Sequence, residues 1–105
     1  MENDYYRALI SATCEEEAKT ILETLLEKHL VAGGLISEGF SHHWWQGKID
    51  REKYYNISSF TLLKNKDQII RVVEELSADD TPVVAFFKIE EASEKTLKWI
   101  DENCL

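Results

Sequence analysis

The stretch Ser41-His42-His43-Trp44-Trp45-Gln46-Gly47-Lys48-Ile49 combines a dense aromatic cluster with a turn signal. Two of the three tryptophans and two of the three histidines occupy four consecutive positions. A glycine directly after such a run is typical of a tight turn between two strands. Aromatic rings with polar tips suit a buried interface or a lined pocket better than open solvent. The stretch therefore predicts the tip of a β-hairpin whose aromatic faces must be covered.

The two arms of this hairpin are long. Residues 35–45 form the first arm, in which Gly39 is expected to mark a bulge or a close approach. Residues 48–63 form the second arm and are rich in β-branched and aromatic side chains. Sixteen residues exceed the usual strand length of about 5–6. We therefore expect a bent hairpin that projects beyond its own sheet.

Apolar periodicity predicts the other elements. Residues 5–12 form a buried strand, and Thr13 is expected to cap the helix that follows. That helix carries one apolar stripe, made of Ala18, Ile21, Leu22, Leu25, Leu26 and Leu30. A second helix over 66–76, a strand over 83–89 after Pro82, and a closing helix over 92–103 complete the chain. The order is that of an α+β, ferredoxin-like β-α-β-β-α-β fold with a C-terminal helix, in a single domain of residues 1–105.

Charge and cysteine content exclude several partners. Twelve basic against twenty acidic side chains give a net charge of −8, which argues against nucleic acid or an anionic membrane surface. No segment is long enough to span a bilayer, and the apolar run 8–10 is too short for a signal peptide. Cys14 and Cys104 lack metal-site spacing and are expected to be reduced thiols. We expect a cytoplasmic protein.

The chain resembles the CutA family of divalent-cation tolerance proteins over nearly its whole length. The hairpin pattern Ser-x-Tyr-x-Trp-x-Gly-Lys-Ile of that family appears here at 41–49, and its late Tyr-Leu-x-Trp-Ile appears at 96–100. The resemblance implies a homotrimer of ferredoxin-like protomers whose hairpins cross between subunits. It also implies an inter-subunit cleft or interface formed by His43, Trp45, Lys48, Tyr54, Phe60 and Trp99.

The resemblance links the chain to copper and other divalent cations, but several polar positions of the family differ here. A cysteine of the family is replaced by Gly33, and its hairpin tyrosine by His43. Its third-strand glutamate and lysine fall on Tyr54 and Phe60, and its His-Pro-Tyr-Glu segment falls on 77–80. An acidic residue that follows the proline in the family is replaced by Val83.

A metal site at His43 needs a ligand from another element or from another subunit. His42 and His43 point to opposite faces of a strand, so they cannot share one ion. His43 could bind Cu or another divalent cation together with Asp79 and Asp80, or with Glu52. The alternatives are that His43 is an aromatic interface residue and that the two aspartates cap a turn.

Two other functions stay open. The nitrogen-regulatory PII proteins, which are similar in design, bind ligands between protomers, and Lys48, Arg51, Lys53 and Lys64 could contact a small anionic ligand. The second open possibility is that the protein is a structural scaffold that has lost its ligand site. Because no nucleophile and base can be paired from this sequence, we expect a binding or regulatory module and not an enzyme.

Overall fold

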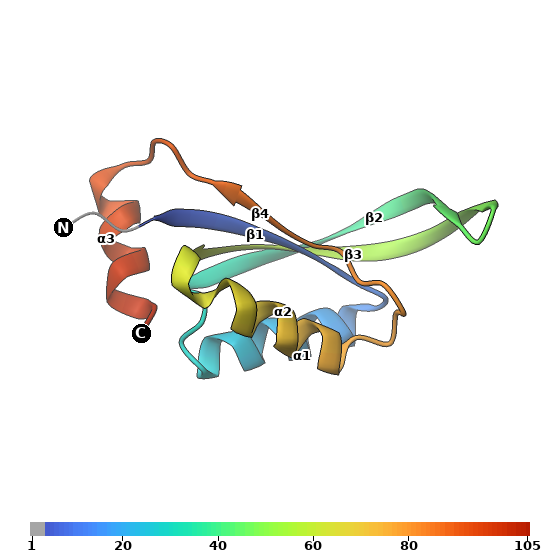
Figure 1. Cartoon of the computed structure of the whole chain (residues 1–105), viewed down its shortest axis with the longest axis horizontal. Helices are drawn as coiled ribbons and strands as arrows, with labels where there is room; N and C mark the ends of the chain where they lie inside the picture. The colour runs from blue at the N-terminus through green and yellow to red at the C-terminus, as the bar shows by residue number, and fades with distance from the viewer. Residues whose placement is uncertain (1–3) are drawn as a thin grey trace.

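The computed structural model describes residues 4–105 and arranges four strands in one antiparallel sheet, with two helices against one face (Figure 1). The sheet order is β2-β3-β1-β4, which is that of a ferredoxin-like fold. The predicted α+β fold with its C-terminal helix is therefore confirmed. The elements are β1 (Tyr5–Ala12), α1 (Glu15–Glu27), β2 (Gly33–Trp45), β3 (Lys48–Leu62), a 3-10 turn (Leu63–Asn65), α2 (Lys66–Leu76), β4 (Val84–Lys88) and α3 (Glu94–Asn103).

The main core lies between the sheet and the two helices. Alternate residues of β1 are buried on this face, and the stripes of α1 and α2 pack against them. Burying one such side chain contributes about 1.5–3 kcal/mol. The predicted stripe of α1 is wrong at two positions: Leu26 is 37% exposed, and Leu30 is buried but follows the helix, which ends at Glu27. The cluster comprises Ile10, Ala12, Ala18, Ile21, Leu22, Leu25, Leu30, Val31, Ile57, Ile69, Val72 and Val73.

The first helix begins one residue later than its predicted cap implies. Cys14 occupies the cap position, and its Sγ accepts the backbone N–H of Glu17 at 3.4 Å. Thr13 instead donates its N–H and its hydroxyl to the two carboxylate oxygens of Glu17, at 2.9 and 3.1 Å. The prediction of Thr13 as the cap was wrong because two adjacent residues can each satisfy the start of a helix. At α3, Ser93 is the cap, so that helix begins at Glu94 and not at Ala92.

The β2–β3 hairpin projects beyond the rest of the sheet, as predicted (Figure 1). Its register runs without interruption from Gly33 opposite Phe60 to Trp45 opposite Lys48. The bulge expected at Gly39 is absent, since Gly39 lies directly opposite Tyr54 in this register. At the tip, Gln46 and Gly47 have φ values of 50° and 80°, the pair of positive angles that a type I′ turn requires.

Candidate functional site

An open groove of about 720 Å³ lies on the face of the sheet opposite α1 and α2. Residues that face each other across an antiparallel ladder point to the same side, so the register decides which side chains reach the groove. His43 lies opposite Asp50, and Ser41 lies opposite Glu52. All four line the groove, together with Trp45 and Tyr54 of the same hairpin.

The loop between α2 and β4 forms another wall of this groove. Asp79, Thr81 and Val83 line it from the side of the loop. The end of the loop is fixed to β1, because Ser11 donates its N–H to the carbonyl of Val83 at 3.0 Å and its hydroxyl oxygen accepts the Val83 N–H at 2.8 Å. The loop is thus held where its carboxylate can meet the hairpin.

Tyr54 joins the hairpin to this loop. Its hydroxyl donates to Oδ2 of Asp79 at 2.7 Å. Its ring meets the His43 imidazole edge to face, with the centroids 5.7 Å apart and the planes at 77°. Burial raises the pKa of the Tyr54 phenol well above its ordinary value, and the hydrogen bond to Asp79 raises it further. The phenol therefore keeps its proton and acts as a donor to the carboxylate.

The polar lining of the groove suits a cation. Ser41 Oγ lies 2.6 Å from Nδ1 of His43, which leaves the other ring nitrogen as the one available to a ligand. Asp50, Glu52 and Asp79 add three carboxylates. Within residues 4–105, however, no three side chains of His, Cys, Asp or Glu are grouped closely enough to hold a metal ion. One chain therefore offers part of a donor set and not a whole site.

Among the residues that the sequence singled out, the structure brings together at the groove His43, Trp45, Glu52, Tyr54 and Asp79. Asp80 does not line the groove, although it follows Asp79 directly. Lys48 pairs with Trp45 at the hairpin tip and is exposed. The remaining expected groups lie elsewhere on the molecule.

Phe60 and Trp99 form a separate contact where α3 meets the start of β2. Their ring centroids are 6.0 Å apart with the planes at 60°. The indole also covers Gly33 so closely that a Cβ there would lie 2.7 Å from its Cζ2 atom. In the structure these two aromatic residues pack within their own chain, at a distance from the groove.

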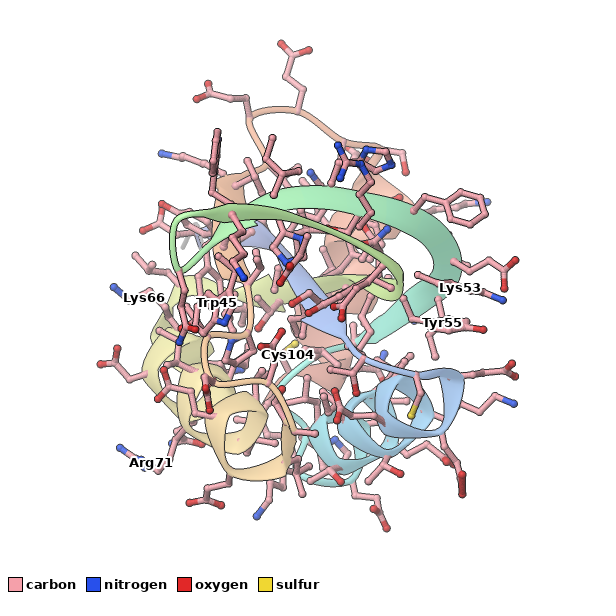
Figure 2. The ribbon with its side chains drawn as sticks, turned by 90° about the vertical axis from the view of Figure 1, so that its right-hand side faces the viewer. Trp45, Lys53, Tyr55, Lys66, Arg71 and Cys104 are labelled. Carbon is pink, nitrogen blue, oxygen red and sulfur yellow. The ribbon has the colours of Figure 1, made fainter. Side chains whose placement is uncertain are left out.

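The four basic residues considered as anion contacts do not gather at the groove. Lys53 makes an ion pair with Glu38 at 3.3 Å and lies 5.8 Å from the centre of the Tyr55 ring. Seen from the hairpin tip, Lys53 lies beside Tyr55 and away from Trp45 (Figure 2). Neither Lys48, Arg51 nor Lys64 lines the groove either. Its charged lining is acidic, which does not favour an anionic ligand.

Sequence reasoning missed part of the groove. Leu9, Ser11 and Asn56 form its floor, but nothing in a single strand indicates which strand will lie beside it. The register of β1 against β3 brings Ser11 opposite Asn56. Period-two alternation could have placed Ser11 on the polar face of its strand, but not next to Asn56.

The same face of the sheet exposes apolar side chains, of which Val83 also lines the groove. Leu35 is 73% exposed, Val83 is 51% exposed and Phe87 is 46% exposed. The strand pairing places all three on the face away from α1 and α2. Leu35 lies opposite Ser58 and Phe87 lies opposite Arg7. The backbone of Val83 is hydrogen-bonded to Ser11. Exposed apolar side chains on one face of a sheet favour covering by another surface.

The fold and the groove together define a class of ferredoxin-like proteins with a long hairpin and an open groove on the face of the sheet away from α1 and α2. Residues 7–103 match the family described as CutA1 divalent ion tolerance protein. The chain therefore belongs to the CutA1 family, a family of divalent-cation tolerance proteins. Within residues 4–105, no helix is both long and apolar enough to cross a membrane.

Individual members of this family are similar to the chain in sequence and in structure. The divalent-cation tolerance protein CutA of Archaeoglobus fulgidus is 32% identical over 94 residues, which cover 90% of this chain and 92% of that protein. The CutA of Pyrococcus horikoshii is 28% identical over 88 residues, covering 84% and 86%. The solved structure of the A. fulgidus protein, described as periplasmic, matches with a TM-score of 0.93, 30% identity and coverage of 96% and 99%. CutA1 of Oryza sativa, at 19% identity, shares the fold with a TM-score of 0.93 over 98% of this chain and 95% of that one.

Proposed function

We propose that this chain acts in divalent-cation tolerance by binding a divalent cation in the groove beside the hairpin. The observation that carries the proposal is that His43 and the three carboxylates of Asp50, Glu52 and Asp79 line the same groove. An imidazole nitrogen and carboxylate oxygens together suit Cu(II) and Zn(II). Membership of a family described by divalent ion tolerance supports the same choice of ligand.

A second copy of the chain completes the donor set in this proposal. One chain contributes His43, Asp50, Glu52 and Asp79 to the groove. Within residues 4–105, these side chains do not form a complete set of metal ligands. The exposed apolar residues of the same face favour covering by another protein surface. The homotrimer that the family resemblance implies provides such a surface through crossing hairpins. Light scattering coupled to size exclusion tests the assembly, and a monomer at micromolar concentration would contradict it.

Titration calorimetry with Cu(II) and with Zn(II) tests the cation site. We expect saturable binding by the wild-type protein and at least about a tenfold loss of affinity in His43→Ala, since one good ligand is worth on the order of 1.4 kcal/mol or more. His42→Ala is the matched control, because it removes the neighbouring imidazole from the opposite hairpin face. Equal affinities for the wild type and His43→Ala would remove His43 from the site. An absence of saturable heat would favour a scaffold that has lost its ligand.

The proposal includes a non-enzymatic role in the cytoplasm, with residues 1–105 as one domain. Ser41 Oγ lies 2.6 Å from Nδ1 of His43 within one strand, but among the described residues no carboxylate is hydrogen-bonded to the His43 ring to orient it as a base. Both cysteines are free, which fits a reducing compartment. Cell fractionation tests the location, and recovery outside the cytoplasm, where the A. fulgidus relative is described, would contradict it.

A further inference from the structure

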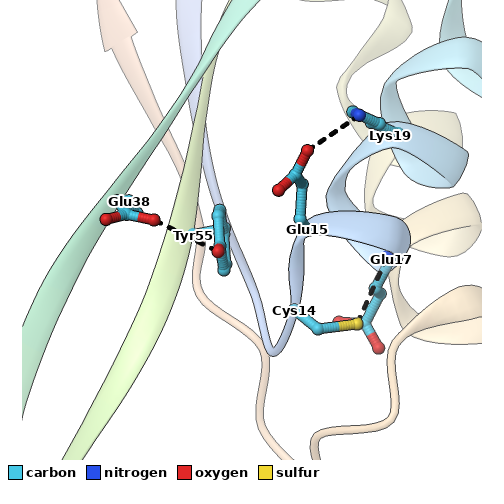
Figure 3. Close-up of polar contacts among 6 residues, drawn as sticks. All are labelled: Cys14, Glu15, Glu17, Lys19, Glu38 and Tyr55. Atoms are coloured by element: carbon cyan, nitrogen blue, oxygen red, sulfur yellow. Dashed lines mark hydrogen bonds and ion pairs between the residues drawn. The ribbon is translucent and has the colours of Figure 1, made fainter.

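Glu17 lies outside the groove but is bonded to the loop that forms one wall of it. It stands at the start of α1 next to Cys14 (Figure 3). Its Oε2 accepts the backbone N–H of Ala78 at 2.9 Å, across 61 residues of sequence. The same carboxylate accepts the N–H and the hydroxyl of Thr13 at 2.9 and 3.1 Å. One side chain thus ties the end of β1, the start of α1 and the α2–β4 loop together.

The bond to Ala78 is placed directly before the groove carboxylate. Asp79 follows Ala78, and its own N–H donates to Ser77 Oγ at 3.1 Å. Its Oδ2 accepts the Tyr54 hydroxyl, and the Tyr54 ring meets His43. The far end of the loop is fixed by the paired bonds between Ser11 and Val83. Residues 78–83 are therefore anchored at both ends, and Asp79 sits beside the Glu17 anchor.

We infer that Glu17 is a positioning residue of the groove, which holds Asp79 where it can meet Tyr54 and so orders His43. The inference rests on the proposed function for its meaning, because the group that Glu17 orders is the proposed cation site. A carboxylate is suited to this role because its two oxygens can accept three donors at once. Fixing a loop end in advance also lowers the ordering cost when a ligand binds.

Nuclear magnetic resonance of the histidine rings tests the positioning without any ligand. The chain has three histidines, and only His43 meets Tyr54. We expect Glu17→Ala to shift the His43 ring signals, since the neighbouring Tyr54 ring moves once Asp79 is free. The signals of His29 and His42 should stay in place. Glu16→Ala is the matched control, since it removes an exposed carboxylate from the same first helical turn.

A pairwise comparison separates positioning from a general loss of structure. Asp79→Ala should shift the His43 signals as Glu17→Ala does, and adding Glu17→Ala to Asp79→Ala should shift them little further, because both act through one contact. Glu17→Gln retains one acceptor oxygen and should show a smaller shift. Unchanged His43 signals in Glu17→Ala, or equal shifts of all three histidines, would overturn the inference.

Titration with Cu(II) then connects the role to function. We expect Glu17→Ala to weaken the affinity about tenfold while Glu16→Ala leaves it unchanged. If the wild type binds no cation but the His43 signals respond as described, the proposed function fails and the positioning role stands. If the wild type binds and Glu17→Ala binds equally well with unmoved His43 signals, the positioning role fails alone.

Discussion

At the scale of single residues, two glycines of β2 carry different constraints. Gly33 lies under the Trp99 indole, where an added Cβ would come within 2.7 Å of Cζ2, whereas the nearest atom to a Cβ on Gly39 is Nδ2 of Asn56 at 3.7 Å. We expect Gly33→Ala to lower the free energy of unfolding by about 1–3 kcal/mol, because the indole must shift. Gly39→Ala should change it by less than about 0.5 kcal/mol. Urea denaturation of both variants measures the difference, and equal values would contradict it.

The pKa of Tyr54 gives a second prediction at this scale. Burial and Asp79 raise the pKa of the folded-state phenol. Its stabilising contribution is therefore complete below the pKa of about 10 of an unfolded tyrosine and is lost as the pH rises above it. We expect Tyr54→Phe to lower the free energy of unfolding by about 0.5–1.5 kcal/mol near neutral pH. That difference should shrink above about pH 10.

Denaturation curves recorded across this pH range at fixed protein concentration check the expectation. Tyr55→Phe is the control, because its hydroxyl donates to the exposed Glu38 at 3.2 Å and its loss should cost less. A difference between wild type and Tyr54→Phe that grew with rising pH would contradict the assignment.

At the scale of the elements, the hairpin tip depends on two positive φ angles. Gly47, with φ of 80°, adopts its angle without steric cost, whereas Gln46, with φ of 50°, does not. We expect Gly47→Ala to destabilise the protein by about 1–2 kcal/mol, because Cβ meets the backbone in this conformation. Gln46→Asn should stabilise it, since asparagine tolerates this region better. Thermal unfolding of the two variants should give melting temperatures on opposite sides of the wild type, and any other order contradicts the turn type.

Most of the elements could be predicted from local chemistry. The period of the apolar stripe identified α1, and the Gln46-Gly47 turn fixed the centre of the hairpin with the correct register. The errors lay where several residues could satisfy the same requirement. Thr13 and Cys14 both suit a helix start, and Gly39 is accommodated in a regular ladder because no neighbour crowds it. Such choices depend on the neighbouring element, which a local pattern does not contain.

The site was harder to predict than the fold. Strand alternation correctly separated His43 and Trp45 from His42, and the uninterrupted register preserves that alternation. The meeting of Tyr54 with Asp79 depends on where the α2–β4 loop crosses the hairpin, 25 residues away in sequence. Phe60 and Trp99 were assigned to the inter-subunit cleft or interface through the family resemblance alone, and in the structure the Phe60 ring of β3 packs on the Trp99 ring of α3.

At the scale of the whole molecule, the two faces of the sheet differ. The helices α1 and α2 lie against one face (Figure 1). The other face carries the groove and exposed apolar side chains. The net charge of −8 repels other copies at long range, so an assembly must depend on short-range apolar contacts. Burial of apolar surface gives about 25 cal/mol per Å², and each large side chain on the open face would add to it. The open face, with Leu35 and Phe87, is therefore one surface at which copies of this chain gain by association, and Phe40 and Trp44, 86% and 71% exposed, offer a second on the other face of the hairpin.

This difference predicts which substitution separates the copies. Leu35 is 73% exposed on the open face, whereas Leu26 is 37% exposed on α1. We expect Leu35→Glu to reduce the molar mass measured by light scattering from that of the proposed trimer to that of a monomer, because a carboxylate without a partner is costly to bury. Leu26→Glu, with the same change in charge, should leave the trimer intact. A trimer that persists in Leu35→Glu would show that the copies associate through a surface other than the open face.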